Sequence, residues 1–304
     1  MYEIKYSELV FKVKFSEDAV LPKHKTLMLN GALLNVLVDL YCIHKRICRS
    51  CSIVSRCLIQ KLLGNGYEAD KPLILQTYNL QPYYVIDCND ENKNFQQDQE
   101  LTFSIRLFHE AIDYISQFIY AFQQIGSTGL SKNKARYTVI GIYNNQNRPI
   151  FENGVFQESN IHIEYISDYI TWRKSCIKNN VALLFTTPFI LEQANFHYFF
   201  DIDNLFYSIK ERLRNFGALE QQDTVWLGAF DEQKYIVHCT LHLVKQIYPI
   251  KALNFNKVII GLKGEIKFSK KAYDLIDYLI ACEKLCIGSH ILLGYGRYII
   301  KGDR

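Results

Sequence analysis

The stretch CIGSHILLGYGRYII, residues 286–300, joins three glycines, a histidine and an arginine to an apolar, strand-like end. A weaker version of this pattern, GSTGLSKNKAR followed by YTVI, covers residues 126–140. Each copy follows a helix-like stretch. Glycine lets the backbone approach a ligand closely and adopt positive φ, and Arg, Lys and successive amides suit a phosphate. The two loops together predict a duplicated scaffold that grips a phosphate backbone.

The first half of the chain is predicted to contain strand, helix, strand, strand, helix and strand. Residues 2–15 alternate between apolar and polar, as a half-buried strand does, and residues 26–47 place leucines and a valine on one helical face. The remaining elements of this half are expected at 73–86 (strand), 101–107 (strand), 111–125 (helix) and 136–142 (strand).

The second half repeats this order. Its elements are expected at 181–186 (a strand ending at Pro188), 199–216 (helix), 234–244 (strand), 257–268 (strand), 272–286 (helix) and 298–301 (strand). A βαββαβ order gives a four-stranded antiparallel sheet with both helices on one face, the ferredoxin-like fold. The predicted fold class is therefore α+β, with two tandem ferredoxin-like (RRM-like) domains. We expect an N-terminal domain at 1–145 with a cysteine-containing insert at about 42–66, a linker at 146–180 that begins in the Asn-rich and Gln-rich stretch 144–159, and a C-terminal domain at 181–304.

Composition narrows the class of protein. With 304 residues, of which 49% are apolar, the chain can build sizeable cores and is globular. The net charge of +4 is too mild to indicate nucleic-acid binding, but residues 44–61 carry six basic side chains and no acid. No signal peptide and no apolar run of membrane-spanning length is visible, so we expect a cytoplasmic protein that makes no membrane contact. Nine cysteines are then reduced thiols or metal ligands.

Several short motifs, read with this order of elements, resemble those of the CRISPR repeat-processing endoribonucleases of the RAMP superfamily. The most specific part is the strand Gly261–Ile266 followed by the glycine-rich segment Gly288–Tyr298. The other matching segments are Leu21-Pro22, Cys48–Cys51 with Cys57, Leu107-Phe108, Gly126–Arg136 and Thr187–Phe189. His109 stands where many members of that family carry glycine.

The resemblance implies a metal-independent endoribonuclease that binds CRISPR repeat RNA and processes the precursor of crRNA. In this family the 2′-hydroxyl attacks the adjacent phosphate and leaves 2′,3′-cyclic phosphate and 5′-hydroxyl ends, without a cofactor. The implied partners are repeat RNA or crRNA and further CRISPR effector subunits, and the implied state is a monomer or a homodimer. Such chemistry needs a proton acceptor, a donor for the leaving oxygen and a cation for the phosphorane charge.

Histidine suits both proton-transfer roles because its ordinary pKa, about 6.5, lies near working pH. In the family the catalytic histidine lies on or near the first helix, often beside Tyr or Lys. His44, with Tyr41 and Lys45, follows that helix here, whereas His24 precedes it. If the helix is unbroken, the two histidines are about 30 Å apart at 1.5 Å per residue and cannot share one site. Both candidates stay open, and both could be solvated residues at the helix ends.

Four cysteines, Cys42, Cys48, Cys51 and Cys57, have the spacing C-x5-C-x2-C-x5-C. The central C-x2-C pair lets two thiolates reach one tetrahedral zinc, and the outer pair could complete the coordination. Five-residue spacers are uncommon for zinc, and a buried helical cysteine would explain Cys42 equally well. A structural zinc and a plain reduced-cysteine insert therefore stay open.

The predicted RNA-binding set combines both glycine loops with a basic strand. It comprises Lys132, Lys134, Arg136, Lys263, Gly294, Gly296 and Arg297, which would meet phosphates if the two loops face one cleft. Tyr295 and Tyr298 could stack on bases, although Tyr298 also fits a strand core. His238 and His242 alternate along a strand and could contact RNA, bind metal or simply lie on the surface.

Two other functions compete with the ribonuclease. The first is a non-catalytic RAMP subunit that holds guide RNA in an effector complex. The second is a metal-stabilised RNA-binding protein unrelated to CRISPR.

Overall fold

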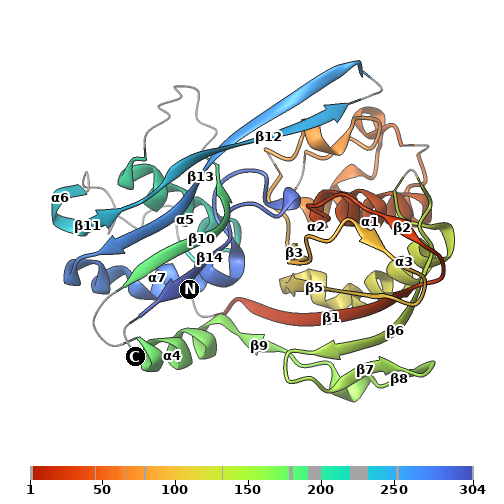
Figure 1. Ribbon diagram of the computed structural model, residues 1–304, viewed down its shortest axis with the longest axis horizontal. Helices are drawn as coiled ribbons and strands as arrows, with labels where there is room; N and C mark the ends of the chain where they lie inside the picture. Colours follow the sequence, from red (N-terminus) through yellow and green to blue (C-terminus); the bar gives the residue numbers. More distant parts are fainter. Residues whose placement is uncertain are drawn as a thin grey trace.

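The computed structural model places two α+β units side by side, the first on the right and the second on the left of Figure 1. It describes residues 3–44, 46–64, 66–78, 80–131, 133–177, 181–190, 200–219, 232–250 and 253–302. Each unit has the βαββαβ order, and the predicted fold class is confirmed.

The first unit is built on a long central strand, β1, Lys5–Phe15. Leu9, Phe11, Val13 and Phe15 on this strand are completely buried, because alternate side chains point to the same face of the sheet. The strand order of this sheet is β3-β5-β1-β6, with antiparallel pairing throughout. The other elements of the unit are α1 (Thr26–Tyr41), β3 (Tyr84–Asp87), β5 (Glu100–Phe108), α3 (Ile115–Thr128) and β6 (Tyr137–Asn144).

The second unit repeats this arrangement with the strand order β11-β13-β10-β14. One further strand, β12 (His242–Ile250), pairs with β13 in a long hairpin that rises beyond the sheet at the top of Figure 1. The other elements are β10 (Ala182–Phe189), α5 (Ile202–Asn215), β11 (Ile236–Cys239), β13 (Phe255–Phe268), α7 (Ile276–Leu285) and β14 (Tyr298–Lys301).

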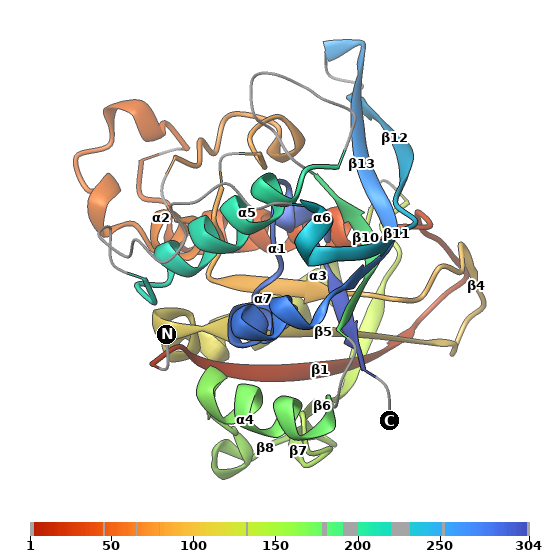
Figure 2. The same ribbon diagram turned by 90° about the vertical axis from the view of Figure 1, so that its left-hand side faces the viewer.

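Additional elements surround the two units. Between α1 and β3 the chain forms two 3₁₀ turns at Cys48–Ser50 and Val54–Arg56, the short helix α2 (Leu58–Leu63) and a third 3₁₀ turn at Leu73–Leu75. Three further strands extend the first sheet: β7 (Pro149–Glu152) pairs with β6, β8 (Val155–Phe156) pairs with β7, and β9 (Glu164–Tyr165) pairs with β1. Helix α4 (Ile166–Cys176) follows β9 in the chain. Helix α4 packs against α7, as Figure 2 shows. The smaller elements are β2 (Ala19–Val20), β4 (Asn94–Phe95), α6 (Glu232–Tyr235) and 3₁₀ turns at His109–Tyr114, Glu158–Asn160, Lys270–Leu275 and Ile291–Leu293.

The two units share buried apolar contacts. Phe108 and Tyr6 of the first unit belong to the hydrophobic cluster of the second, and Leu292 of the second belongs to the cluster of the first. A buried arginine on α5, Arg212, adds polar contacts: its guanidinium donates to the carbonyls of Leu285 (3.0 Å) and Pro82 (2.9 Å). Burial lowers the pKa of Arg212 to about 10, which still leaves it charged at neutral pH. The relative position of the units is therefore fixed by packing as well as by the chain.

Several predicted boundaries are wrong. The helix expected over 26–47 ends at Tyr41, because Cys42 adopts an extended conformation with ψ 106°. Only the end of the strand expected over 73–86 is a strand, since Leu73–Leu75 follows Pro72 as a 3₁₀ turn. In the second half, β10 runs through Pro188 with a register shift instead of ending there. The strand expected over 234–244 is divided into the end of α6, β11 and the start of β12.

Candidate functional site

The segment between α7 and β14 has an unusual backbone. Cys286, Gly288, His290, Gly294 and Gly296 all adopt positive φ, at 61°, 81°, 61°, 83° and 73°. L-residues rarely adopt this conformation, and a cluster of such residues commonly marks a constrained functional segment. We call residues 286–297 the glycine loop.

Two glycines of this loop are required by close packing. A Cβ on Gly296 would lie 1.7 Å from the carbonyl oxygen of Ile287, and a Cβ on Gly294 would lie 2.8 Å from Oγ1 of Thr26. Thr26 is the first residue of α1 in the other unit. The loop is thus folded tightly on itself and against the N-terminus of α1.

The backbone amides of the loop are largely engaged within the protein. The amides of Gly294, Gly296 and Arg297 donate to protein oxygen atoms at 2.8, 2.8 and 2.9 Å. An amide already engaged in this way is not available to cradle a phosphate. These three amides are therefore not free to bind a phosphate.

Polar contacts hold the loop to the first unit. Asn30 of α1 donates to the carbonyl of Leu292 at 2.8 Å, and Nδ1 of the fully buried His290 lies 2.5 Å from Oγ1 of Thr77. These partners are 262 and 213 residues apart in the sequence. The glycine loop therefore joins the two units.

Arg297 takes part in this connection. Its guanidinium forms an ion pair with Asp87 at the end of β3, and Nη1 also donates to Asn89 Oδ1 at 3.3 Å. Burial lowers the pKa of Arg297 to about 10. The predicted phosphate ligand Arg297 is thus held by a carboxylate of the other unit, although its side chain still lines the pocket described next.

A pocket of about 260 Å³ lies beside the loop, with walls from both units. Four of the predicted functional residues line it: His24, Lys263, Gly294 and Arg297. The remaining lining residues are Lys23, Thr26, Cys88, Asn89, Glu91, Thr186, Thr187, Pro188, Val244, Gln246, Leu293 and Tyr295. We call this cavity the loop pocket.

The electrostatics of the loop pocket suit an anion. Burial lowers the pKa of His24 below its ordinary value; Glu91 opposes this shift, and Lys23, Lys263 and Lys25 add to it, so the neutral imidazole is favoured at pH 7. Lys23 pairs with Glu91 at 3.0 Å. Lys263 is exposed, and no carboxylate among the described residues forms an ion pair with it. Lys263 is therefore the cation of this pocket that is best able to bind a phosphate, and it lies near the imidazole of His24.

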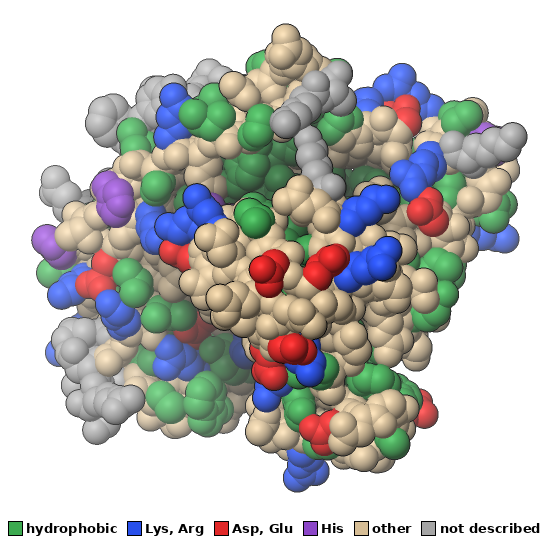
Figure 3. All heavy atoms as spheres, turned by 45° about the vertical axis from the view of Figure 1, so that its right-hand side comes forward, with side chains coloured by type: hydrophobic (Ala, Val, Ile, Leu, Met, Phe, Trp, Pro, Cys, Tyr) green, Lys and Arg blue, Asp and Glu red, His purple; other side chains and the backbone are tan. Residues whose placement is uncertain are grey.

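The described residues of the first glycine-containing loop do not line this pocket. Gly129 adopts φ 90°, and an isolated bridge between Leu130 and Ala135 closes a tight turn after α3. Lys134 and Arg136 are exposed, but neither lines the loop pocket. Lys132 lies outside the described residues. On the face shown in Figure 3, basic and acidic side chains are interspersed, so no continuous basic track marks the described part of that face.

The second candidate histidine lies at the other end of α1. His44 is exposed, and its Nε2 lies 3.3 Å from Oγ of Ser50. Tyr41 is also exposed, and Lys45 lies outside the described residues. Helix α1 has 16 residues, so about 24 Å of helix separates the position of His24 from that of His44.

Comparison with known proteins supplies the family. The family model described as AF_1859_N, N-terminal domain, matches residues 4–164, which is more than half of the chain. The chain belongs to this family. No curated protein matches the chain.

The fold is also that of solved Cas6 proteins. A Cas6 product complex is 13% identical over 98% of this chain and 100% of its own, with a TM-score of 0.52. Thermus thermophilus Cas6 is 10% identical over 98% of this chain and 99% of its own, with a TM-score of 0.51. A chain of a partial Cas6-RT-Cas1–Cas2 complex is 12% identical, with a TM-score of 0.56. The present chain is covered to 99% in that match but spans only 46% of the larger chain.

The four cysteines of the insert are free thiols in the structure. Cys42, Cys48, Cys51 and Cys57 are half-buried. Sγ of Cys42 accepts the amide of Arg46 at 3.2 Å, and burial raises the pKa of the Cys48 thiol. Among the described residues, no group of three or more His, Cys, Asp or Glu side chains is arranged to hold a metal ion. The zinc site stays a prediction.

Sequence reasoning missed part of the loop pocket, whereas its strand-core alternative for Tyr298 is confirmed. Lys23 belongs to a basic run beside His24, but nothing in the sequence indicates that Asn89 faces the glycine loop. Tyr295 and Tyr298 are 4% and 2% exposed and cannot stack on a base. His238 and His242 are exposed, on β11 and β12. Neither belongs to a group of His, Cys, Asp or Glu side chains that could hold a metal ion, among the residues that the structure describes. None of the helices described is long and apolar enough to cross a membrane.

Proposed function

We propose that this protein binds CRISPR repeat RNA at the loop pocket and cleaves precursor crRNA as a metal-independent endoribonuclease. The observation that carries the proposal is the meeting of His24, Lys263 and the glycine loop in one pocket of a Cas6-type fold. These residues come from both units, so the pocket exists only when the units are docked. One of the solved Cas6 structures with this fold is a product complex, which supports RNA as the ligand.

The phosphate is proposed to contact side chains and not loop amides. Lys263 carries an ammonium group that no described carboxylate pairs with, and Lys23 adds a second cation that Glu91 partly neutralises. Arg297 keeps the loop against β3 through Asp87. Lysine and arginine beside a desolvated phosphate stabilise the charge that develops on the phosphorane.

Proton transfer is proposed to lie with a histidine. A neutral imidazole can accept the proton of the 2′-hydroxyl as that oxygen attacks phosphorus. The P–O5′ bond then breaks, and the leaving oxygen takes a proton from an acid or from water. His24 has the neutral state and the neighbouring cations that this step needs. His44 with Tyr41 and Lys45 is the second candidate centre, because it follows the first helix as in the family that the sequence resembles.

Single substitutions test the two centres. Cleavage of repeat RNA is measured with His24→Ala and His44→Ala, each compared with His162→Ala, a control whose histidine lies outside the loop pocket. Loss of a proton-transfer group lowers the cleavage rate by roughly 10²–10⁴-fold. The proposal requires this loss in one of the two variants and wild-type rates in the control. Normal cleavage by both His24→Ala and His44→Ala would show that neither centre is catalytic.

The same RNA-binding pocket could serve a non-catalytic subunit that holds guide RNA, and the rate measurement separates the two. Tight binding without cleavage by the wild-type chain supports that role.

Two of the solved structures with this fold are Cas6-RT-Cas1–Cas2 complexes, so further CRISPR proteins are proposed partners. A protein that processes or holds CRISPR RNA would work in the cytoplasm.

Structural zinc at the four cysteines is proposed separately, and elemental analysis of protein purified without chelator tests it.

A further inference from the structure

A second and larger pocket, of about 610 Å³, lies between the units on the side of α2 and α5. Its walls come from α2, the segment before β3, the turn after β5, and the C-terminal end of α5. A volume of this size is typical of pockets that accept small molecules. We call it the inter-unit pocket. None of the residues predicted from the sequence to be functional lines it.

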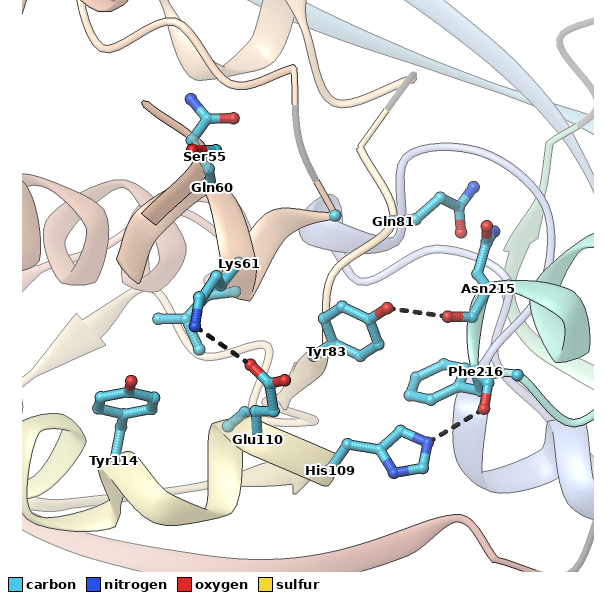
Figure 4. Close-up of a pocket in the computed structure, with 14 residues that line it drawn as sticks. Ser55, Gln60, Lys61, Gln81, Tyr83, His109, Glu110, Tyr114, Asn215 and Phe216 are labelled. Atoms are coloured by element: carbon cyan, nitrogen blue, oxygen red, sulfur yellow. Dashed lines mark hydrogen bonds and ion pairs between the residues drawn. The ribbon is translucent and has the colours of Figure 1, made fainter. Parts of the chain in front are cut away.

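One end of the inter-unit pocket is aromatic. Tyr83 and Phe216 meet edge to face with ring centroids 5.2 Å apart, and the His109 ring lies 5.5 Å from that of Phe216. Figure 4 shows these three rings together on one side of the pocket, with Lys61, Glu110 and Tyr114 on the other. Rings of this kind offer faces and edges on which a flat heterocycle can stack.

The aromatic end is held rigidly. The hydroxyl of Tyr83 donates to the carbonyl of Asn215 at 2.9 Å, and the guanidinium of Arg212 lies 4.7 Å from the centre of the Phe216 ring. Arg212 also donates to Gln81 Oε1 at 3.2 Å. A ligand would therefore meet rings that are already in position, which reduces the entropic cost of binding.

His109 is held in a strained conformation at this end. Its φ is 46°, a value that most side chains disfavour, and it directly follows β5. Strained residues of this kind tend to gather at functional sites. Nε2 of His109 lies 3.2 Å from the carbonyl of Phe216, which can only accept, so Nε2 carries the proton and Nδ1 of the neutral ring is an acceptor. Burial lowers the pKa of His109 and keeps the ring neutral at pH 7.

The charge of the pocket is balanced. Lys61 and Glu110 are its only charged lining residues among those described, and they pair at 3.7 Å. In contrast to the loop pocket, the described lining of this site therefore offers no unpaired cation to a phosphate. Several neutral polar groups have no hydrogen-bond partner among the described residues: the hydroxyls of Ser55 and Tyr114, the side-chain amide of Asn215, and Nδ1 of His109. Such a set matches the donors and acceptors on the edge of a nucleobase.

We propose that the inter-unit pocket binds one unpaired base of the bound RNA, stacked on the half-buried rings of Tyr83 and His109, with the buried Phe216 ring packed beside them. This inference rests on the proposed function for the identity of its ligand. It adds a second contact between the protein and RNA, which depends on the base and not on the phosphate. Because both pockets have walls from both units, docking of the units would create the two sites together.

Free nucleosides test the pocket without any phosphate. Binding of adenosine, guanosine, cytidine and uridine to the full chain is followed by saturation-transfer NMR, which detects weak ligands. The test variant is the double substitution His109→Asn and Tyr114→Phe, which keeps a residue tolerant of positive φ at position 109 and removes only a hydroxyl at 114. Tyr120→Phe, an exposed tyrosine on α3 outside the pocket, is the matched control.

We expect at least one nucleoside to bind the wild type and Tyr120→Phe, and to bind the double variant roughly tenfold more weakly. Lys263→Ala should leave nucleoside binding unchanged while weakening RNA binding. A wild type that binds RNA but no nucleoside, or a double variant that binds nucleosides normally, would overturn the pocket and leave the proposed function intact. A wild type that binds nucleosides in this pocket but no RNA would overturn the proposed function instead.

Discussion

At the scale of single residues, Gly296 shows why the glycine pattern in the sequence is informative. The pattern predicts a glycine that lets a phosphate approach the backbone. The structure instead brings the carbonyl of Ile287 to the place where a side chain would be, 1.7 Å from an added Cβ. The glycine is needed for the fold of the loop, and the loop in turn shapes the pocket.

Gly296→Ala should therefore destabilise the protein by about 2–4 kcal/mol, because it combines a backbone clash with strain at positive φ. Gly154→Ala is the matched control, since Gly154 has a similar φ of 79° but open space around its Cα. The control should cost only about 1 kcal/mol. Urea unfolding measures both, and an equal decrease in stability for the two variants would contradict the role given to close packing.

The pKa of His24 gives a pH prediction at the same scale. A base acts in its neutral form, and burial lowers the pKa of His24 below its ordinary value of about 6.5. If His24 accepts the 2′-proton, kcat/KM should stay level as pH falls from 8 to about 6.5 and decline only below that value. The pH profile is measured in buffers of constant ionic strength. A decline centred above pH 6.5 would argue against His24 as the base.

At the scale of elements, both βαββαβ orders could be predicted because burial follows the strand and helix periods so regularly. The central strand β1 buries Leu9, Phe11, Val13 and Phe15, as alternation requires. The errors lie where apolar residues continue past the end of an element. Ile43 and Ile47 extend the apolar pattern of α1 but are 77% and 52% exposed, so the pattern there does not report burial.

Helix α5 offers the sharpest prediction at this scale. Arg212 is completely buried and donates to the carbonyl of Pro82 and the side-chain amide oxygen of Gln81 across the unit interface, and to the carbonyl of Leu285 within its own unit. Arg212→Met would leave those acceptors without partners, at a cost of about 1–3 kcal/mol for each buried group. We expect the free energy of unfolding to fall by about 3–5 kcal/mol in total.

The control lies on the same helix. Arg214 is partly exposed and pairs with Glu211 at 2.8 Å, so Arg214→Met should cost about 1 kcal/mol or less. Thermal and urea unfolding distinguish the two variants. If Arg212→Met were as stable as Arg214→Met, the buried arginine would not hold the units together.

At the scale of the whole molecule, the site could not be predicted because the docking of the units creates it. His24 and Lys263 are far apart in the sequence, and contacts such as Asn30 to Leu292 bring their elements together. Periodicity reports the buried face of one element but not the partner that covers it. The prediction that both glycine-containing loops face one cleft depended on such docking, and among the described residues of the two loops, only those of the C-terminal loop line the loop pocket.

The loop pocket predicts how RNA binding responds to salt. A lysine that neutralises a phosphate of single-stranded RNA releases a counterion, and each such lysine contributes about 0.7 to the slope of log K against log salt. Lys263→Ala should weaken RNA binding and reduce the slope by about that amount. Lys301→Ala, whose lysine pairs with Glu265 at 2.9 Å, should leave the slope unchanged. Filter binding at several salt concentrations measures both, and identical slopes for the two variants would remove Lys263 from the RNA site.

The central claim is that docked ferredoxin-like units form a metal-independent ribonuclease site. It is tested most directly by incubating the purified chain with its repeat RNA in excess EDTA and determining the chemistry of the product ends by mass spectrometry. We expect cleavage at one position, with a 2′,3′-cyclic phosphate on one product and a 5′-hydroxyl on the other. Repeat RNA that stays intact while bound, or cleavage that requires a divalent metal and leaves a 5′-phosphate, would contradict the claim.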